Sequence, residues 1–382
     1  MRYQADHLDD LLRQLYPAIL GEGATVVPSR GKTRELVGVL LELTNPRSRL
    51  SRTETRGKPF SALGELLWYL SGDNRLEHIL PYVPRYARES EDNITVHGGY
   101  GPRLLKHRGR HNQIHAVTEV LRASPASRRA VIQIFDAEDT SRRWKEVPCT
   151  TSLQFLVRDG KLNLVVTMRS NDAYLGLPHD VFCFTMLQEL VARDLGVDLG
   201  IYRHFVGSMH IYQDDTYQND TRAVERYLKE AFQRRLEMPQ MPLGNPWPAV
   251  TRLREAERRV RAGEVFDAGA IGLDPYWADL VRLLQIHFAR GNMTRLDELH
   301  AALTDPGYRT FVEGQRRLQP PVTPGPLQPV LIPSSCLFHC PSGHGAKARP
   351  TGSQPASRPT RGGTGRYRVS CLVAPVMRSW RR

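Results

Sequence analysis

The sequence predicts an α+β (α/β) fold in which helices pack against a β-sheet, and three observations support this class. Leucines recur at helical spacing over residues 6–19. Two apolar, β-branched runs, 153–158 and 162–168, are joined by Asp159-Gly160, which is a strong signal for a β-hairpin. A further amphipathic helix pattern follows over residues 179–196.

The early part of the chain contains two candidate functional side chains. Arg30 lies in a polar loop, residues 24–34, and could hold an anion, although a solvated loop arginine is the commoner case. A strand is expected over residues 36–43. Glu65 is the only charge in the apolar helix 61–72, and burying an unpaired carboxylate is costly. Glu65 is therefore a candidate acid or base, with a solvent-facing position as the alternative.

Two further features precede the hairpin. Glycines and a proline around Tyr100 predict a tight turn, and a helix is expected over residues 112–123. Arg128 and Arg129 directly precede the β-rich run 130–135. Paired guanidinium groups suit phosphate recognition, although a surface pair is the commoner explanation.

The hairpin brings a thiol and a guanidinium together. Cys149 lies at the entrance of its first strand and Arg169 at the exit of the second, so the two are expected nearly level across the pair. A neighbouring guanidinium lowers the pKa of a thiol and can also hold an anion. The alternative is a small buried cysteine and a surface arginine.

After the hairpin, Asp180 is placed in the first turn of the helix that follows Pro178, where the helix dipole favours an acid. A strand over residues 201–206 runs into His210 and Tyr212, and a charged helix then reaches about Leu236.

The last part of the chain changes in composition. Helical segments extend to residue 318, so we expect one folded domain over 1–318 and a disordered tail rich in Pro, Gly and Arg over 319–382. Cysteines and histidines in this tail have loosely zinc-like spacing, but no element would fix them as ligands, and no metal is expected. These residues are Cys336, His339, Cys340 and His344.

Bulk composition narrows the class of protein. The chain has 382 residues, is 40% apolar and carries a net charge of +13. Part of that charge lies in residues 342–382, which contain no Asp or Glu, so it does not by itself indicate nucleic acid. No run approaches the length of a membrane span and the N-terminus lacks a signal-peptide pattern, so we expect a cytoplasmic protein whose five cysteines are reduced.

Several motifs, in order and at compatible spacing over roughly residues 20–220, resemble the thymidylate synthase superfamily. They are Glu65 to Asp73, Tyr100-Gly101, Ser127-Arg128-Arg129, Pro148-Cys149, Arg169 to Asp172, Leu175 to Pro178, and His210-Ile211-Tyr212. The resemblance implies a large mixed β-sheet packed with helices, with the sheet forming the interface of a homodimer. It makes residues 1–318 a catalytic domain.

The resemblance also implies roles for individual residues. Cys149 would add to C6 of a pyrimidine nucleotide, which makes C5 nucleophilic toward the methylene carbon of 5,10-methylenetetrahydrofolate. Arg30, Arg169 and Ser170 would bind the phosphate, with Arg128 and Arg129 supplied by the second subunit. His210 and Tyr212 would contact the sugar, Glu65 and Tyr100 would organise proton transfer through water, and Asp172 and Tyr86 would lie on the folate side.

One departure bears on the base. Synthases that act on dUMP have an asparagine where this chain has Asp180. An ionised aspartate cannot donate to O4 of uracil, whereas it complements the amino edge of cytosine. The sequence therefore resembles the deoxycytidylate or cytidylate 5-hydroxymethylase branch, with dCMP ahead of CMP.

Other departures bear on how the reaction ends. Thr150 replaces a histidine after the cysteine, and Tyr86 and Glu89 stand where synthases have two tryptophans. Weaker shielding of the exocyclic methylene intermediate would let water add instead of hydride. Two alternatives remain open, which are a thymidylate synthase that tolerates Asp180 and a noncatalytic RNA-binding protein.

Overall fold

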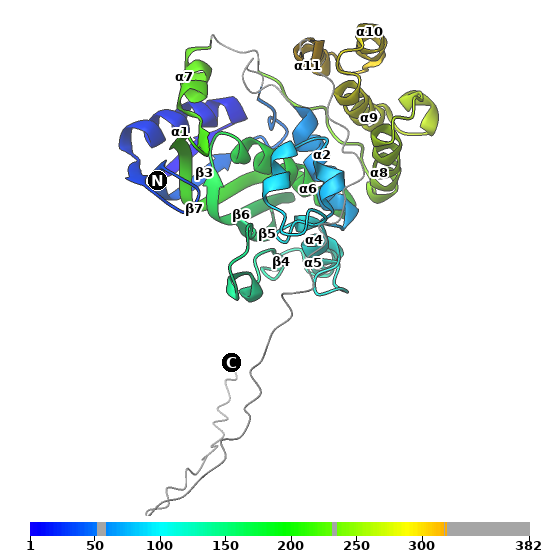
Figure 1. Cartoon of the computed structure of the whole chain (residues 1–382). Coiled ribbons are helices and arrows are strands. Elements are labelled where there is room, and N and C mark those ends of the chain that lie inside the picture. The colour runs from blue at the N-terminus through cyan, green and yellow to red at the C-terminus, as the bar shows by residue number, and fades with distance from the viewer. Residues whose placement is uncertain (52–58, 231–234, 317, 319–382) are drawn as a thin grey trace, which may run out of the picture. The chain divides into compact units, whose positions relative to one another are not determined.

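A mixed eight-stranded β-sheet organises the chain in the computed structural model, which describes residues 1–51, 59–230, 235–316 and 318 (Figure 1). The strand order is β1-β3-β7-β6-β5-β4, with β2 paired to β3 and β8 to β7. The β1–β3 and β6–β7 pairs are parallel and the other pairs are antiparallel. The fold class predicted from the sequence is confirmed. The strands are β1 (Arg2–Ala5), β2 (Ala24–Val26), β3 (Thr33–Leu43), β4 (Val131–Gln133), β5 (Thr150–Arg158), β6 (Lys161–Asp172), β7 (Asp198–Asp214) and β8 (Gln218–Asn219).

The predicted hairpin is formed by β5 and β6. Asp159 and Gly160 have φ angles of 51° and 70°, the left-handed geometry that a two-residue hairpin turn requires. At the open end of the hairpin, the amide nitrogen of Arg169 donates to the carbonyl oxygen of Cys149 at 2.8 Å. The expectation that these two residues lie level across the strand pair is confirmed.

Helices cover one face of the sheet because its strands alternate buried and half-exposed residues along their length. Helices α1 and α6 pack on β3, β6 and β7, and α2 packs on α6, as Figure 1 shows. The α-helices are α1 (Leu8–Glu22), α2 (Pro59–Ser71), α3 (Leu76–Ile79), α4 (Tyr100–Leu105), α5 (Gln113–Ala123), α6 (Gly176–Leu195), α7 (Thr221–Lys229), α8 (Trp247–Arg261), α9 (Pro275–Phe288), α10 (Met293–Ala302) and α11 (Pro306–Arg316). The 3-10 helices are η1 (Pro84–Arg88), η2 (Ala137–Thr140) and η3 (Ala268–Ile271).

A helical layer follows the sheet in sequence. Helix α9 packs against α8, α10 and α11, and it also contacts α2. A buried ion pair between Arg49 and Glu189, 2.5 Å apart, secures α6, and the second carboxylate oxygen of Glu189 accepts from the amide of Met241. Helix α2 is therefore held between α6 and the helical layer.

Several predicted boundaries were wrong. The polar loop 24–34 contains strand β2, and the turn around Tyr100 begins helix α4 instead. Helix α6 begins at Gly176, so Asp180 lies beyond its first turn and the helix dipole does not account for an acid there. Helix α7 ends at Lys229, short of Leu236.

The predicted tail and its zinc-like residues lie outside the described residues, and the domain boundary at 318 stays a prediction. Among the helices that the structure describes, none is long and apolar enough to cross a bilayer.

Candidate active site

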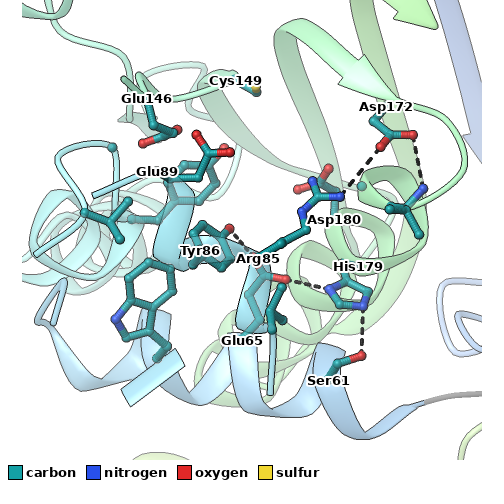
Figure 2. A pocket seen from close by; sticks show the side chains of 18 of the residues that line it. Ser61, Glu65, Arg85, Tyr86, Glu89, Glu146, Cys149, Asp172, His179 and Asp180 are labelled. Carbon is teal, nitrogen blue, oxygen red and sulfur yellow. Dashed lines mark hydrogen bonds and ion pairs between the residues drawn. The ribbon is translucent and has the colours of Figure 1, made fainter. Parts of the chain in front are cut away.

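A cavity of about 370 Å³ lies between α2, η1, α6 and the end of the β5–β6 hairpin (Figure 2). This size suits a small ligand. Seven residues singled out in the sequence line it, although they come from segments up to 150 positions apart along the chain. They are Arg30, Glu65, Tyr86, Tyr100, Cys149, Asp172 and Asp180.

Cys149 presents its sulfur at the upper edge of this cavity in Figure 2. Nη2 of Arg169 lies 3.7 Å from Sγ, while Nε of Arg169 donates to the carbonyl oxygen of Pro148 at 2.9 Å. Arg169 lowers the pKa of the Cys149 thiol, as expected from the sequence, but a larger effect opposes it. Burial raises the pKa of Cys149 to about 11, because desolvation of the thiolate outweighs the opposing charge of Arg169.

Glu65 is buried on α2 and accepts three hydrogen bonds from side chains. Tyr69 and Tyr86 donate to Oε1 at 3.1 and 2.8 Å, and Nδ1 of His179 lies 2.7 Å from Oε2. Burial alone would raise the pKa of Glu65, but the hydrogen bond and charge of His179 and the two tyrosine hydroxyls outweigh it and lower that pKa. Glu65 is therefore an ionised carboxylate inside the cavity, not a solvent-facing residue.

Asp180 has the opposite character, although it lines the same cavity. Burial and the charge of Glu65 raise the pKa of Asp180 well above its ordinary value, which favours the neutral carboxylic acid. Two carboxyl groups in one cavity are thus held in different protonation states, which is the arrangement that general acid and base chemistry uses.

A buried polar chain orients the Asp180 carboxyl. Asn171 Nδ2 donates to Oδ2 of Asp180 at 2.8 Å, and Oδ1 of Asn171 lies 3.1 Å from Nε2 of His204. His204 is neutral, because burial lowers its pKa to about 3, and its Nδ1 lies 2.6 Å from the hydroxyl of Tyr202. Since Asn171 already donates to Oδ2, the proton of Asp180 belongs on Oδ1.

Arg30 lies at the end of the cavity near Glu89 and Glu146. Nη2 of Arg30 is 2.5 Å from a Glu89 oxygen and 2.6 Å from the carbonyl oxygen of Lys145. Burial, with the charge of Glu89 adding to it, raises the pKa of Glu146 to about 7. Arg30 is therefore engaged by a carboxylate in this structure, and an anionic ligand would have to displace Glu89.

Two more predicted residues have well-defined partners. Tyr100 donates to Oγ1 of Thr150 at 3.0 Å and accepts from the Thr150 amide at 3.1 Å, which fixes its hydroxyl beside the cysteine strand. Oδ1 of Asp172 accepts from the amides of Tyr174 and Leu175, and Oδ2 accepts from Gln218 at 3.1 Å.

The remaining predicted residues lie outside the cavity lining. His210 and Tyr212 are buried on β7 with their rings 5.0 Å apart, and Ser170 is half-buried on β6. Arg128 and Arg129 are exposed at the start of β4, where neither guanidinium reaches this cavity.

Four acidic, basic or histidine residues of the lining were not predicted as site residues from the sequence. All four lie close in sequence to predicted site residues. His179 directly precedes Asp180, and the others lie near Tyr86 or Cys149. They are Arg85, Glu89, Glu146 and His179. Glu89 was noted only as a departure from the synthase pattern, and local sequence could not show that Glu89 faces Arg30.

The chain is similar in sequence to known proteins. Residues 23–248 match the family model described as thymidylate synthase. A protein of Pseudomonas phage M6 named deoxyuridylate hydroxymethyltransferase is 36% identical over 164 residues, which cover 42% of this chain and 46% of the relative. Relatives of the same name come from Bacillus phage SP01, 32% identical over 219 residues, and Delftia phage PhiW-14, 28% identical over 241 residues.

The matched segments cover 53% of this chain and 57% of the SP01 relative, and 59% of this chain and 64% of the PhiW-14 relative. The chain thus spans between about half and two thirds of the length of these relatives. The family model covers more than half of the chain and includes every lining residue of the cavity. The protein therefore belongs to the thymidylate synthase family.

Proposed function

We propose that the protein transfers the one-carbon unit of 5,10-methylenetetrahydrofolate to C5 of a pyrimidine deoxynucleoside monophosphate and then adds water. The products are the 5-hydroxymethyl nucleotide and tetrahydrofolate. The observation that carries the proposal is that the sulfur of Cys149, the ionised Glu65 and the neutral Asp180 share one cavity. The names of the three phage relatives support hydroxymethylation over methylation.

Cys149 is the proposed nucleophile. Attack on C6 requires the thiolate, and the raised pKa of Cys149 means that the thiol must lose its proton as the carbon–sulfur bond forms. The Arg169 guanidinium, 3.7 Å from the sulfur, would stabilise that charge. The electron pair displaced from the C5–C6 double bond makes C5 nucleophilic, and C5 bonds to the methylene carbon of the folate. Loss of the C5 proton to a water held beside Tyr100, with cleavage of the carbon–nitrogen bond to the folate, would release tetrahydrofolate and leave an exocyclic methylene group on the ring.

The remaining substrate contacts follow the family resemblance. Arg30, Arg169 and Ser170 are proposed for the 5′-phosphate, with Arg128 and Arg129 of a second copy completing that site in a homodimer. The exposure of both arginines away from their own cavity supports this sharing. His210 and Tyr212 are proposed for the sugar, and Asp172 and Tyr86 for the folate.

The base is proposed to be uracil, in accord with the names of the relatives. An ionised Asp180 could not donate to O4 of uracil, but a protonated one can. Its Oδ1–H would donate to O4 while a carboxyl oxygen accepts from N3–H. The same acid form also complements cytosine, donating to N3 and accepting from the amino group. Asp180 therefore keeps dCMP, and CMP behind it, as the second candidate.

Glu65 is the proposed base for the final addition. Water would give a proton to the Glu65 carboxylate while its oxygen bonds to the exocyclic methylene carbon and the displaced electron pair moves to the O4 side of the ring. That pair then re-forms the C5–C6 double bond as the carbon–sulfur bond breaks, which releases the Cys149 thiolate.

The decisive experiment incubates the full chain with methylenetetrahydrofolate and dUMP, dCMP or CMP, and identifies products by mass. We expect 5-hydroxymethyl-dUMP and tetrahydrofolate, with none from a Cys149→Ser variant. Formation of dTMP and dihydrofolate would identify a synthase instead. Absence of turnover with every nucleotide would overturn the proposal and favour a noncatalytic, nucleic-acid-binding role, whose affinity should fall steeply with salt.

A further inference from the structure

We infer that His179 is a positioning residue that keeps Glu65 ionised and aimed at the attacking water. This inference rests on the proposed function. His179 lines the cavity between Asp180 and α2, and neither the sequence motifs nor the comparisons assign it a role. Figure 2 shows its ring between Glu65 and Ser61.

The geometry fixes which ring nitrogen carries the proton. Glu65 is ionised and can only accept, so Nδ1 of His179 must donate to Oε2 over their 2.7 Å separation. Nε2 lies 3.0 Å from the hydroxyl oxygen of Ser61 and forms a second hydrogen bond there. Ser61 and Glu65 are one helical turn apart on α2, so a single face of this helix holds both ends of the imidazole.

The two oxygens of Glu65 have unequal surroundings. Oε1 accepts from both tyrosine hydroxyls, whereas Oε2 pairs with Nδ1 of His179. A carboxylate oxygen accepts more than one hydrogen bond, so Oε2 can still receive the proton of a water that His179 leaves unobstructed. The side chain of His179 is 24% exposed against 7% for Glu65, so the imidazole is the more solvent-accessible partner of this pair.

Other titratable groups around Glu65 do not replace this donor. The hydroxyls of Tyr69 and Tyr86 donate to Oε1, and Arg85 interacts with Glu65 through charge without a hydrogen bond to it. Ionised Asp180 or Cys183 would repel the Glu65 carboxylate. The groups facing Glu65 are Tyr69 on α2, Arg85 and Tyr86 on η1, and Asp180 and Cys183 on α6. Loss of the His179 donor should therefore raise the pH at which Glu65 ionises.

The chain offers a matched pair of variants. His179→Asn retains an N–H near the Nδ1 position, and His179→Leu removes the donor at similar volume. We expect the acid limb of the pH profile for hydroxymethyl product to move to higher pH in His179→Leu, with kcat at low pH reduced about 10- to 100-fold. The profile of His179→Asn should remain close to that of the wild type, and the nucleotide KM should change little in either variant.

A second cavity beside His179 makes a chemical-rescue experiment possible. Ser61 and His179 also line a neighbouring cavity of about 240 Å³, which offers space for a small molecule beside the ring. Added imidazole should restore activity to His179→Ala but not to His179→Leu, whose side chain fills the site. An unmoved acid limb in folded His179→Leu, or no rescue of folded His179→Ala, would overturn the inference.

A direct titration separates this inference from the proposed function. The Glu65 carboxyl is followed by ¹³C NMR in wild type and in the Asn and Leu variants, with Glu65→Gln assigning its signal. A higher ionisation midpoint only in His179→Leu supports the role of His179 even if no nucleotide turns over, in which case the proposed function fails alone. Equal midpoints in all three proteins contradict the role of His179, whatever the turnover.

Discussion

Asp180 illustrates how burial decides the chemistry of a single residue. As an ionised group it would exclude uracil, but its surroundings keep it protonated. A folded-state pKa raised above the unfolded value means that the native state binds the extra proton. Stability therefore falls as pH rises from the ordinary aspartate value toward the raised one.

The Asp180→Asn variant tests this protonation state. An asparagine still accepts from Asn171 and carries no charge, so we expect it to be more stable than the wild type by roughly 1–3 kcal/mol at about pH 8, with the two converging near pH 4. Denaturant unfolding across this range measures the difference. Uracil turnover should persist and cytosine turnover should fall. If the difference in unfolding free energy between wild type and variant did not change with pH, Asp180 would be ionised in the folded protein.

Arg30 and Glu89 form an ion pair at the proposed phosphate site. The carboxylate occupies the guanidinium that the phosphate is proposed to use, with side-chain exposures of 12% for Glu89 and 36% for Arg30. In Glu89→Gln we expect the nucleotide KM to fall roughly fivefold, since a partly exposed ion pair contributes about 1 kcal/mol. The exposed acid Glu138, changed to Gln, is the control. A higher KM in Glu89→Gln would show that Glu89 helps to hold the nucleotide.

At the scale of elements, α2 and η1 must pack closely for Tyr86 to reach Glu65. Gly64 allows this contact, because a Cβ at this position would lie 2.2 Å from the ring of Tyr82. That ring is buried and its hydroxyl donates to Glu257 at 2.9 Å, so it cannot easily move away.

Gly64→Ala should therefore lower the free energy of unfolding by about 1–3 kcal/mol and reduce kcat by displacing η1. Gly21→Ala on α1 is the matched control, because nothing lies within 4 Å of its added Cβ. Urea unfolding and steady-state kinetics measure both effects. Equal stability of the two variants would show that α2 and η1 can separate without cost.

At the scale of the whole molecule, the second face of the sheet explains how two copies could share sites. Apolar side chains remain exposed on its strands, including Val37 at 73% on β3, Val131 at 44% on β4 and Phe205 at 40% on β7. A proposed homodimer through this face would cover them and bring Arg128 and Arg129 to the partner's cavity.

Phe205→Glu should therefore yield a monomer in sedimentation analysis with little residual activity. Val265→Glu, at an apolar residue 82% exposed beyond α8, should leave both assembly and activity unchanged. Mixing Cys149→Ser with an Arg128→Ala, Arg129→Ala double variant should restore activity, because mixed dimers contain one intact site. No restoration by mixing would contradict shared sites.

The sequence alone determined the fold class, the hairpin and seven of the residues that line the cavity. These depend on local signals, since the Asp159-Gly160 turn pairs β5 with β6 and the motif spacing identifies the family. The irregularity between Thr150 and Ser152, which shifts the pairing by one residue, places Cys149 opposite Arg169. Only the tertiary structure decided the protonation states of Cys149, Glu65 and Asp180, and it alone brought His179 and Glu89 to their partners. The physical reason is that desolvation and hydrogen bonding depend on which distant segments surround a group, and α2, η1 and α6 meet only in the folded chain.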